Sequence, residues 1–165
     1  YPQRNLLFRN EGSSNGPVRF KEIGLQLGLT SEQVSRGTAS GDYDGDGDVD
    51  ILVFNTGETL NLFRNDNQAT DINWLWVDLR SNGGNSHGVG ARLILAANGI
   101  EQVREVRGSR SYLSQSDYRV HFGLADAQRA DWLEVHWLSG LKERYQQLES
   151  NQVLRIEEGS GQRIP

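Results

Sequence analysis

The chain of 165 residues contains no cysteine, and this absence excludes disulfide scaffolds, cysteine-based zinc fingers and thiol catalysis. Methionine is also absent and the chain begins with Tyr1, so we expect a piece of a longer protein whose targeting signal has been removed. Proline occurs only three times, and no apolar run approaches the roughly 20 residues of a membrane helix. We therefore expect a protein that does not span a membrane.

Basic residues are fewer than acidic residues in this chain. The chain has 17 Lys and Arg residues against 22 Asp and Glu residues, which gives a net charge of −5. Nucleic-acid binding needs a basic surface, so this balance argues against a nucleic-acid partner. Five of the acids fall within residues 42–50, and the remainder of the chain is close to neutral.

Glycine is abundant, with 19 residues, and it clusters with asparagine between short runs of apolar and aromatic residues. This spacing predicts an all-β protein with many tight turns. Asn98-Gly99 lies between two such runs and is a strong signal for a β-hairpin. The strands that we expect cover residues 5–10, 19–24, 50–55, 60–65, 72–80, 91–97, 101–108, 117–124, 131–140, 142–148 and 152–158.

Residues 50–55 read DILVFN, and this segment is apolar on both faces. Ile51 and Val53 alternate with Leu52 and Phe54, so the two faces of the strand carry two apolar residues each. Such a pattern is typical of a strand that is covered on both sides. We therefore predict a buried, central strand here.

The segment GDYDGDGDVD (41–50) has an aspartate at every second position from residue 42 to residue 50. Two carboxylates about 4 Å apart repel each other by roughly 1 kcal/mol in water and by more near a protein surface. Five of them would force the loop apart unless a cation lay between them. The sequence offers oxygen ligands only, with no histidine or cysteine nearby, which favours calcium over softer metals. A solvated acidic turn is the alternative interpretation.

The spacing fits a calcium loop of the EF-hand type. Asp42, Asp44 and Asp46 fall at positions 1, 3 and 5, and the backbone carbonyl of Asp48 falls at position 7. Position 12 is Val53, where an EF-hand has glutamate, and no helical pattern flanks the loop. We therefore expect the loop to lie in a β-hairpin, with Asp50 as the bidentate ligand in place of the missing glutamate.

The stretch GTASGDYDGDGDVDILVFN, followed by LFRND, resembles the FG-GAP/VCBS repeat of integrin-like β-propellers, and the resemblance covers about residues 5–66. It implies a propeller-type four-stranded blade whose loop holds Ca²⁺. Its side-chain ligands would be Asp42, Asp44, Asp46 and Asp50, with a backbone ligand from Asp48. Because a propeller typically needs 4–8 blades, either further blades precede this one or it packs against the second module.

Residues 71–158 resemble the ASPIC/UnbV domain, through the motifs GGNSHGVGARL, QVREVRG, SYLSQSDYRVHFGLADA, ADWLEVHWLSG and NQVLRI. That domain follows FG-GAP repeats in the cartilage acidic protein family and in bacterial secreted proteins. The resemblance implies a small β-sandwich or barrel, and a secreted, extracellular or periplasmic location. We expect a blade over 1–68, an ASPIC/UnbV domain over 69–159 and a frayed tail over 160–165. The linker 65–71 is short, so the two modules should touch.

Polar residues outside the Asp loop offer a second candidate surface, for a glycan or a peptide at the cell surface. Its members would be Arg104, Tyr112, Gln115, Arg119 and Trp132, with Trp132 as an exposed aromatic platform. The alternative is that the arginines form ordinary ion pairs across neighbouring strands. His121 alternates with apolar positions, so we expect it to be exposed.

Three functions remain open at this point. The first is a calcium-binding, non-catalytic adhesion or recognition module at the C-terminal end of a larger β-propeller protein. The second is a lectin-like domain that binds glycans through its calcium. The third is a glycosidase that uses paired carboxylates, for which Glu134 and Asp131 are the candidates. A serine hydrolase built on Ser86 and His87 is not supported, because the G-x-S-x-G motif is absent.

Overall fold

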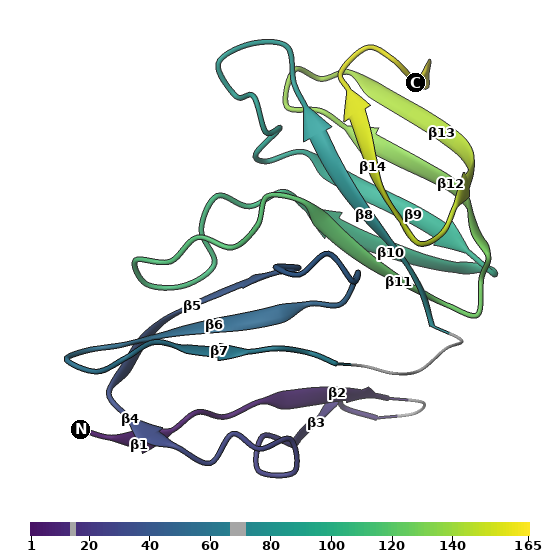
Figure 1. Cartoon of the computed structure of the whole chain (residues 1–165). Helices are drawn as coiled ribbons and strands as arrows, with labels where there is room; N and C mark the ends of the chain where they lie inside the picture. Colours follow the sequence, from purple (N-terminus) through teal and green to yellow (C-terminus); the bar gives the residue numbers. More distant parts are fainter. Residues whose placement is uncertain (14–15, 67–71) are drawn as a thin grey trace.

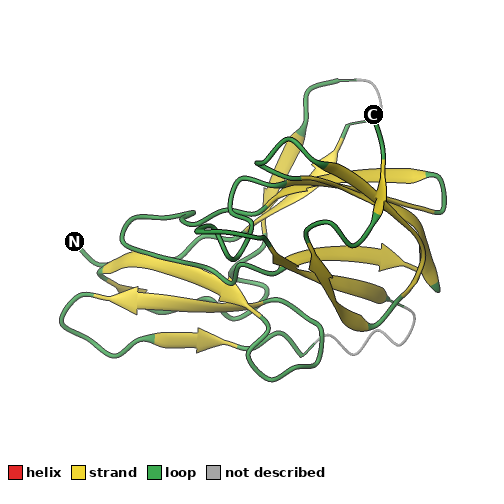
Figure 2. Cartoon of the chain, turned by 90° about the horizontal axis from the view of Figure 1, so that it is seen from above, coloured by secondary structure: helices red, strands yellow, loops and turns green. Residues whose placement is uncertain are grey.

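The computed structural model describes residues 1–13, 16–66 and 72–165, and the regular structure in this part consists of β-strands. Figure 2 shows these strands and the loops between them, with no helix among the described residues. The predicted all-β class is therefore confirmed. No helix in the same residues is long and apolar enough to cross a membrane.

The second half of the chain forms two sheets that face each other across one core (Figure 1). Neither sheet closes into a barrel, so of the two predicted architectures the structure has the sandwich. The larger sheet has the order β10 (Ile100–Glu105), β9 (Arg92–Ala97), β12 (Arg129–His136), β13 (Lys142–Glu149) and β15 (Gln162–Arg163). The smaller sheet has the order β11 (Val120–Ala125), β8 (Asn73–Arg80) and β14 (Gln152–Glu157).

The alternating pattern of the sequence explains this core. Leu133 and Val135 of β12 are fully buried, as are Leu75 and Val77 of β8, because side chains two apart share one face of a strand. The predicted hairpin joins β9 to β10. Asn98 and Gly99 have φ values of 48° and 75°, as a two-residue turn with two left-handed positions requires.

The first part of the chain forms three smaller sheets (Figure 1). The loop with the aspartates joins the first two strands of a three-stranded sheet, so the predicted hairpin is present, but no fourth strand pairs with this sheet in the described residues. The segments that precede it pair in two separate sheets instead. The strands are β5 (Ser35–Gly41), β6 (Asp50–Asn55) and β7 (Asn61–Phe63); β2 (Phe8–Gly12) with β3 (Arg19–Glu22); and β1 (Gln3–Arg4) with β4 (Glu32–Gln33).

The strand β6 is central but is not buried on both faces, so that prediction is wrong. Val53 is 3% exposed, whereas Leu52 and Phe54 are 37% and 59% exposed. Leu52 pairs with Leu62 of β7, which is also exposed, and no other sheet of the described chain covers this face. The apolar residues of β6 therefore form one packed face and one open face.

The end of the chain is anchored, so the expectation of a frayed tail over 160–165 is also wrong. Gln162–Arg163 pair with β13, and the buried side chain of Glu143 explains why the preceding turn is fixed. Its oxygens accept hydrogen bonds from the backbone N–H groups of Gly159 (3.0 Å) and Gly161 (2.7 Å) and from the indole N–H of Trp137 (2.7 Å). These bonds satisfy a polar group that would be costly to bury alone.

The two halves of the chain touch, as the short linker predicts, although residues 67–71 of that linker lie outside the described part. Gly47, in the Asp loop (residues 42–50), lies directly against β8. Its carbonyl oxygen accepts a hydrogen bond of 3.0 Å from the indole N–H of Trp76. A Cβ atom on Gly47 would overlap the indole of Trp74, and φ at Gly47 is 98°. Only glycine fits this position without strain.

A second set of contacts joins β5 to the segment that precedes β11. The backbone N–H of Asp117 donates to the carbonyl of Ser40 at 2.9 Å, and the N–H of Ser40 donates to the hydroxyl of Ser116 at 3.1 Å. Arg119 donates to the carbonyl of Asp42 at 3.3 Å, and its guanidinium lies 5.1 Å from the ring centre of Trp76. The blade and the sandwich therefore share a polar and aromatic junction.

Gly47→Ala should lower the free energy of unfolding by about 2–5 kcal/mol, because a left-handed φ costs an alanine about 1–2 kcal/mol and displacing Trp74 with the new methyl group costs about 1–3 kcal/mol more. Gly57→Ala is the matched control, since Gly57 also has a positive φ of 76° but faces open space. The control should lose only the backbone cost. Urea denaturation of both variants measures the difference, and equal losses would contradict the close contact at Gly47.

Glu143→Ala should lower the free energy of unfolding by about 2–4 kcal/mol, because it leaves several buried donors without an acceptor. Glu143→Gln keeps one carbonyl oxygen and should lose less. Glu149→Ala, at an exposed position of the same strand, serves as the control and should change stability by less than about 0.5 kcal/mol. Amide hydrogen exchange at both Gly159 and Gly161 should accelerate in Glu143→Ala and stay unchanged in Glu149→Ala, and unchanged exchange in Glu143→Ala would refute the anchoring role.

Candidate metal site in the Asp loop

Three carboxylates of the Asp loop converge on one point. One oxygen each of Asp42, Asp44 and Asp50 lies within 4.8 Å of the others, and no other group of this kind occurs in the described ranges of the chain. Calcium binds oxygen at about 2.4 Å, so two oxygens on the same ion lie at most about 4.8 Å apart. The geometry of the three carboxylates therefore fits a single calcium ion.

Backbone N–H groups of the loop hold two of these carboxylates in place. Asp42 accepts from the N–H of Gly45 at 2.7 Å and from the N–H of Gly47 at 3.1 Å. Asp50 accepts from the N–H of Tyr43 at 3.0 Å and from the N–H of Asn65 at 2.8 Å. Asp42 and Asp50 are 9% and 3% exposed, so two negative side chains are buried in fixed positions. The backbone of the loop therefore fixes the positions of these two carboxylates.

The cationic side chains near the loop are engaged elsewhere. Arg64 lies 4.0 Å from Asp44 but only 2.6 Å from Asp66, and its pKa is raised mainly by the hydrogen bond to Asp66. The pKa of Arg119 is raised mainly by its hydrogen bond to Asp117. Arg119 contacts the loop through a backbone carbonyl and makes no ion pair with Asp42 in the described structure. The negative charge of the three aspartates is therefore only weakly balanced by the protein.

The other two predicted ligands, Asp46 and Asp48, are not among the three converging residues. Asp46 is exposed and stands outside the group of three, and its side chain accepts a hydrogen bond of 2.9 Å from the N–H of Asp48. That bond fixes the turn in which the carbonyl of Asp48 lies. The structure thus brings together Asp42, Asp44 and Asp50, and it places Asp46 at the edge of the loop.

The second candidate surface is not one surface. Tyr112 is 69% exposed in a loop, whereas Arg119 lies at the junction between the modules. Trp132 on β12 is half-buried beneath Arg144, whose guanidinium lies 4.7 Å from the ring centre. Arg104 lies on the edge strand β10 and pairs with no carboxylate in the described part of the chain. Gln115 lines a groove that borders the Asp loop.

Glu134, one of the two carboxylates predicted for acid–base catalysis, does not have a raised pKa. A general acid needs a raised pKa. Burial raises the pKa of Glu134, but hydrogen bonds from Arg144 and His136 outweigh it, so the pKa is lowered overall. Asp131 is exposed. His87 stacks on the ring of Tyr118 with 4.4 Å between ring centres, and its Nδ1 lies 3.3 Å from Arg80.

The prediction that His121 is exposed is wrong. His121 is half-buried rather than exposed, and its ring centre lies 4.9 Å from that of Trp76. Burial lowers the pKa of His121, and the nearby charge of Arg104 lowers it further. Its Nε2 is buried without a hydrogen-bond partner among the described residues. The alternation of β11 correctly separated His121 from the core, but the blade covers that outer face.

A groove of about 560 Å³ borders the Asp loop. One wall carries Asp42 and Asp50 with the open apolar side chains of Leu52 and Leu62, and the other carries Gln115 and the two residues after it. Both modules thus contribute to it. Its residues combine apolar area with a few polar groups, as ligand sites commonly do.

Each half of the chain matches a known protein family. The family described as ASPIC and UnbV matches residues 81–163, and the FG-GAP repeat matches residues 36–72. Cartilage acidic protein 1 of Homo sapiens is 31% identical over 159 residues, which cover 92% of this chain and 23% of that protein. The protein of the same name from Xenopus tropicalis is 32% identical over 146 residues, which cover 84% of this chain and 22% of that protein.

The chain therefore spans about a quarter of the length of these relatives. The ASPIC and UnbV match itself covers half of the 165 residues and coincides with the sandwich from the end of β8 to β15. The FG-GAP match covers the three-stranded sheet and the Asp loop. With both resemblances confirmed, the chain belongs to the ASPIC and UnbV family and carries an FG-GAP repeat ahead of that region.

Proposed function

We propose that this chain is a calcium-binding, non-catalytic recognition module of a larger, secreted β-propeller protein. The observation that carries the proposal is the convergence of Asp42, Asp44 and Asp50 within 4.8 Å. We divide the chain at residues 68 and 69, so that an FG-GAP blade (1–68) with the metal site precedes an ASPIC/UnbV domain (69–159). A role in adhesion outside the cell or in the periplasm, with a protein or glycan ligand at a cell surface, is part of the proposal.

The chemistry of the loop supports calcium. Its donors are oxygen atoms, whereas softer metals favour nitrogen or sulfur. The full ligand set would be the side chains of Asp42, Asp44, Asp46 and Asp50 with the backbone carbonyl of Asp48. Asp46 would join the other three through a change of side-chain rotamer alone, because it is exposed at the edge of the loop.

The ion's role in this proposal is structural. The Asp loop is also the surface on which the blade meets β8, through Gly47 and Trp76. A bound cation would remove the repulsion between buried carboxylates and stiffen the loop that carries this contact. Calcium would therefore fix the orientation of the blade on the sandwich as well as the fold of the hairpin.

The environment of Glu134, a candidate for acid–base catalysis, supports a non-catalytic role. Glu134 is held by Arg144 and His136 with a lowered pKa, which suits an ion pair rather than a general acid. The carboxylates that converge do so at the metal site. The relatives are named for cartilage and for acidity, and neither word describes a reaction.

Calcium at about 100 times its dissociation constant should raise the free energy of unfolding by about 2.7 kcal/mol and the melting temperature by about 5–10 °C. A chelator should return both to the lower value. Asp44→Asn should abolish most of this response and should raise the calcium-free stability by up to about 1 kcal/mol, because it removes one of the repelling carboxylates. Asp44 is exposed, and Arg64 approaches it only to 4.0 Å in the described structure, so little else is lost with its carboxylate. Thermal melts with a calcium titration measure both effects.

Two further variants complete this test. Asp131→Asn removes the same charge from an exposed site in the other module and should respond to calcium like the unmodified chain. Asp46→Asn decides whether Asp46 is a ligand, since it should weaken calcium binding about tenfold if its carboxylate reaches the ion. A melting curve that calcium and chelator leave unchanged would remove the proposal.

Calcium-dependent glycan binding is the second candidate, and the groove beside the Asp loop favours it. Asp42 and Asp50 lie in the groove wall together with Tyr43, an aromatic residue that is 58% exposed. Sugar hydroxyls in this groove would approach the ion from the open side. A glycan array probed in calcium and in chelator should show binding that the chelator abolishes, and Gln115→Ala should reduce it. Signals that are independent of calcium would leave the metal with its structural role alone.

A further inference from the structure

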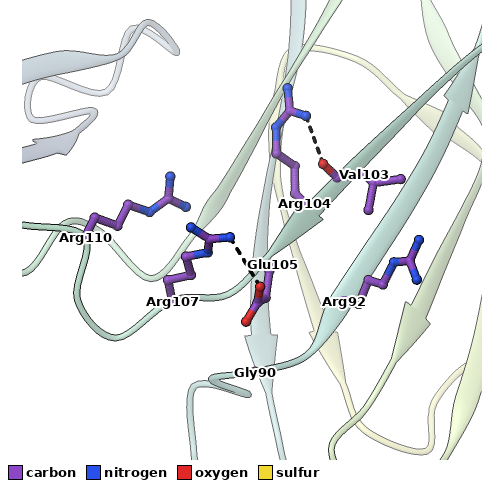
Figure 3. Close-up of a pocket in the computed structure, with 7 residues that line it drawn as sticks. All are labelled: Gly90, Arg92, Val103, Arg104, Glu105, Arg107 and Arg110. Carbon is purple, nitrogen blue, oxygen red and sulfur yellow. Dashed lines mark hydrogen bonds and ion pairs between the residues drawn. The ribbon is translucent and has the colours of Figure 1, made fainter.

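Four arginines surround one cavity on the sandwich, well away in sequence from the Asp loop. The cavity has a volume of about 540 Å³, and Arg92, Arg104, Arg107 and Arg110 line it together with Gly90, Val103 and Glu105. Figure 3 shows that Arg107 and Arg110 extend into the same region beside Glu105, with Arg104 and Arg92 placed around the end of β10. Four positively charged residues and one negatively charged residue thus line this cavity, in a chain whose net charge is −5.

The fold explains why these charges gather here. Strand β10 is the edge of the larger sheet, and Arg92 of β9 lies directly opposite Glu105 across the β9–β10 ladder. Residues opposite each other in an antiparallel pair share one face of the sheet. The chain then leaves β10 into the loop that carries Arg107 and Arg110, which curls back toward the same edge. Edge strand and loop together form a basic rim.

These arginines are poorly neutralised by the protein. Arg107 has Glu105 at 3.5 Å, a long contact between exposed groups that contributes little. Arg92, Arg104 and Arg110 make no ion pair within the described residues. An arginine that has no carboxylate partner keeps its planar set of donors available for an oxyanion.

The protein holds the guanidinium of Arg104 in a fixed orientation. Arg104 donates to the carbonyl of Val103 at 3.0 Å and to the side-chain oxygen of Gln102 at 3.1 Å. Its guanidinium also lies 5.6 Å from the ring centre of the buried Phe122. A side chain held in this way loses less conformational entropy when it binds a ligand than a free one does. The rim therefore combines one fixed guanidinium with three movable ones.

We propose that this arginine rim binds an acidic polysaccharide through its sulfate or carboxylate groups. The cavity is much larger than one such group and is open, so a single small anion would stay solvated and bind weakly, whereas a chain of anions gains from each arginine and from released counterions. A nucleic acid is less suitable, because single-stranded binding sites stack bases on aromatic side chains and none of the seven lining residues is aromatic. The rim shares no residue with the Asp loop, so this binding does not depend on calcium.

Heparin, hyaluronan and a single-stranded oligonucleotide of matched charge are the probes, each titrated against the full chain at several salt concentrations, with calcium and with chelator. We expect heparin to bind at low salt, with an affinity that falls as salt rises and that chelator leaves unchanged. Binding of heparin alone assigns sulfate as the recognised group, and binding of hyaluronan as well assigns carboxylate too. An oligonucleotide that binds as tightly as heparin would overturn the proposal, as would the absence of any polysaccharide binding.

The triple variant Arg92→Gln/Arg107→Gln/Arg110→Gln should weaken heparin binding at least about tenfold and reduce its salt dependence, because three arginine contacts to sulfate or carboxylate groups are lost. The matched control is Arg19→Gln/Arg129→Gln/Arg163→Gln, which removes the same charge from exposed arginines outside the rim. The control should retain affinity within about threefold. Equal losses in the two triple variants would show that net charge alone is responsible and would refute the rim.

All six positions are exposed, and urea denaturation checks that both triple variants stay folded. If the triple variant of the rim unfolds, the single variants Arg92→Gln and Arg110→Gln replace it, with Arg129→Gln as their control. Each rim variant should then weaken heparin binding more than the control does. The chelator arm separates this proposal from calcium-dependent glycan binding, since loss of calcium would abolish binding in the groove and leave binding at the rim intact.

Discussion

The contact between Gly47 and β8 is the constraint on which the arrangement of the whole chain depends. A loop that carries five carboxylates would ordinarily be held away from an apolar sheet by its own hydration. Here the loop presents a backbone carbonyl to the indole of Trp76 and the bare Cα of a glycine to Trp74. The carboxylates of Asp42, Asp44 and Asp50 can therefore turn toward one another while the backbone at Gly47 packs against the sandwich.

This geometry links the two modules to the charge state of the loop. Asp42 accepts the N–H of Gly47 at 3.1 Å, so one residue connects the converging carboxylates to the Trp76 contact. Arg119 holds the same loop from the sandwich side through the carbonyl of Asp42. Any cation that draws Asp42, Asp44 and Asp50 together must act on these bonds too. Under the proposed function, metal binding in the blade would therefore be coupled to packing at the junction.

The sequence predicted what local rules determine and missed what depends on distant partners. Asn98-Gly99 specifies its turn alone, and alternation alone places Leu133 in the core. The same alternation could not show that the outer face of β8 is covered at Trp76 or that β6 is open at Phe54, because both depend on which sheet packs where. The Asp spacing predicted five ligands, and the structure brings three of these residues together. The side chain of Asp46 accepts a hydrogen bond from the N–H of Asp48, and the spacing does not reveal that bond.

The sequence also did not predict where the charges of Glu143 and of the arginine rim lie in the fold. In a strand that alternates polar residues, Glu143 reads as solvent-facing, yet it is fully buried because backbone donors from a later turn reach it. The net charge likewise does not say where the individual charges lie. Electrostatic interactions are screened over about 8–10 Å in physiological salt, so a ligand responds to the side chains next to it and hardly to the sum over the chain. A net charge of −5 therefore does not prevent the edge of β10 from acting as a basic surface.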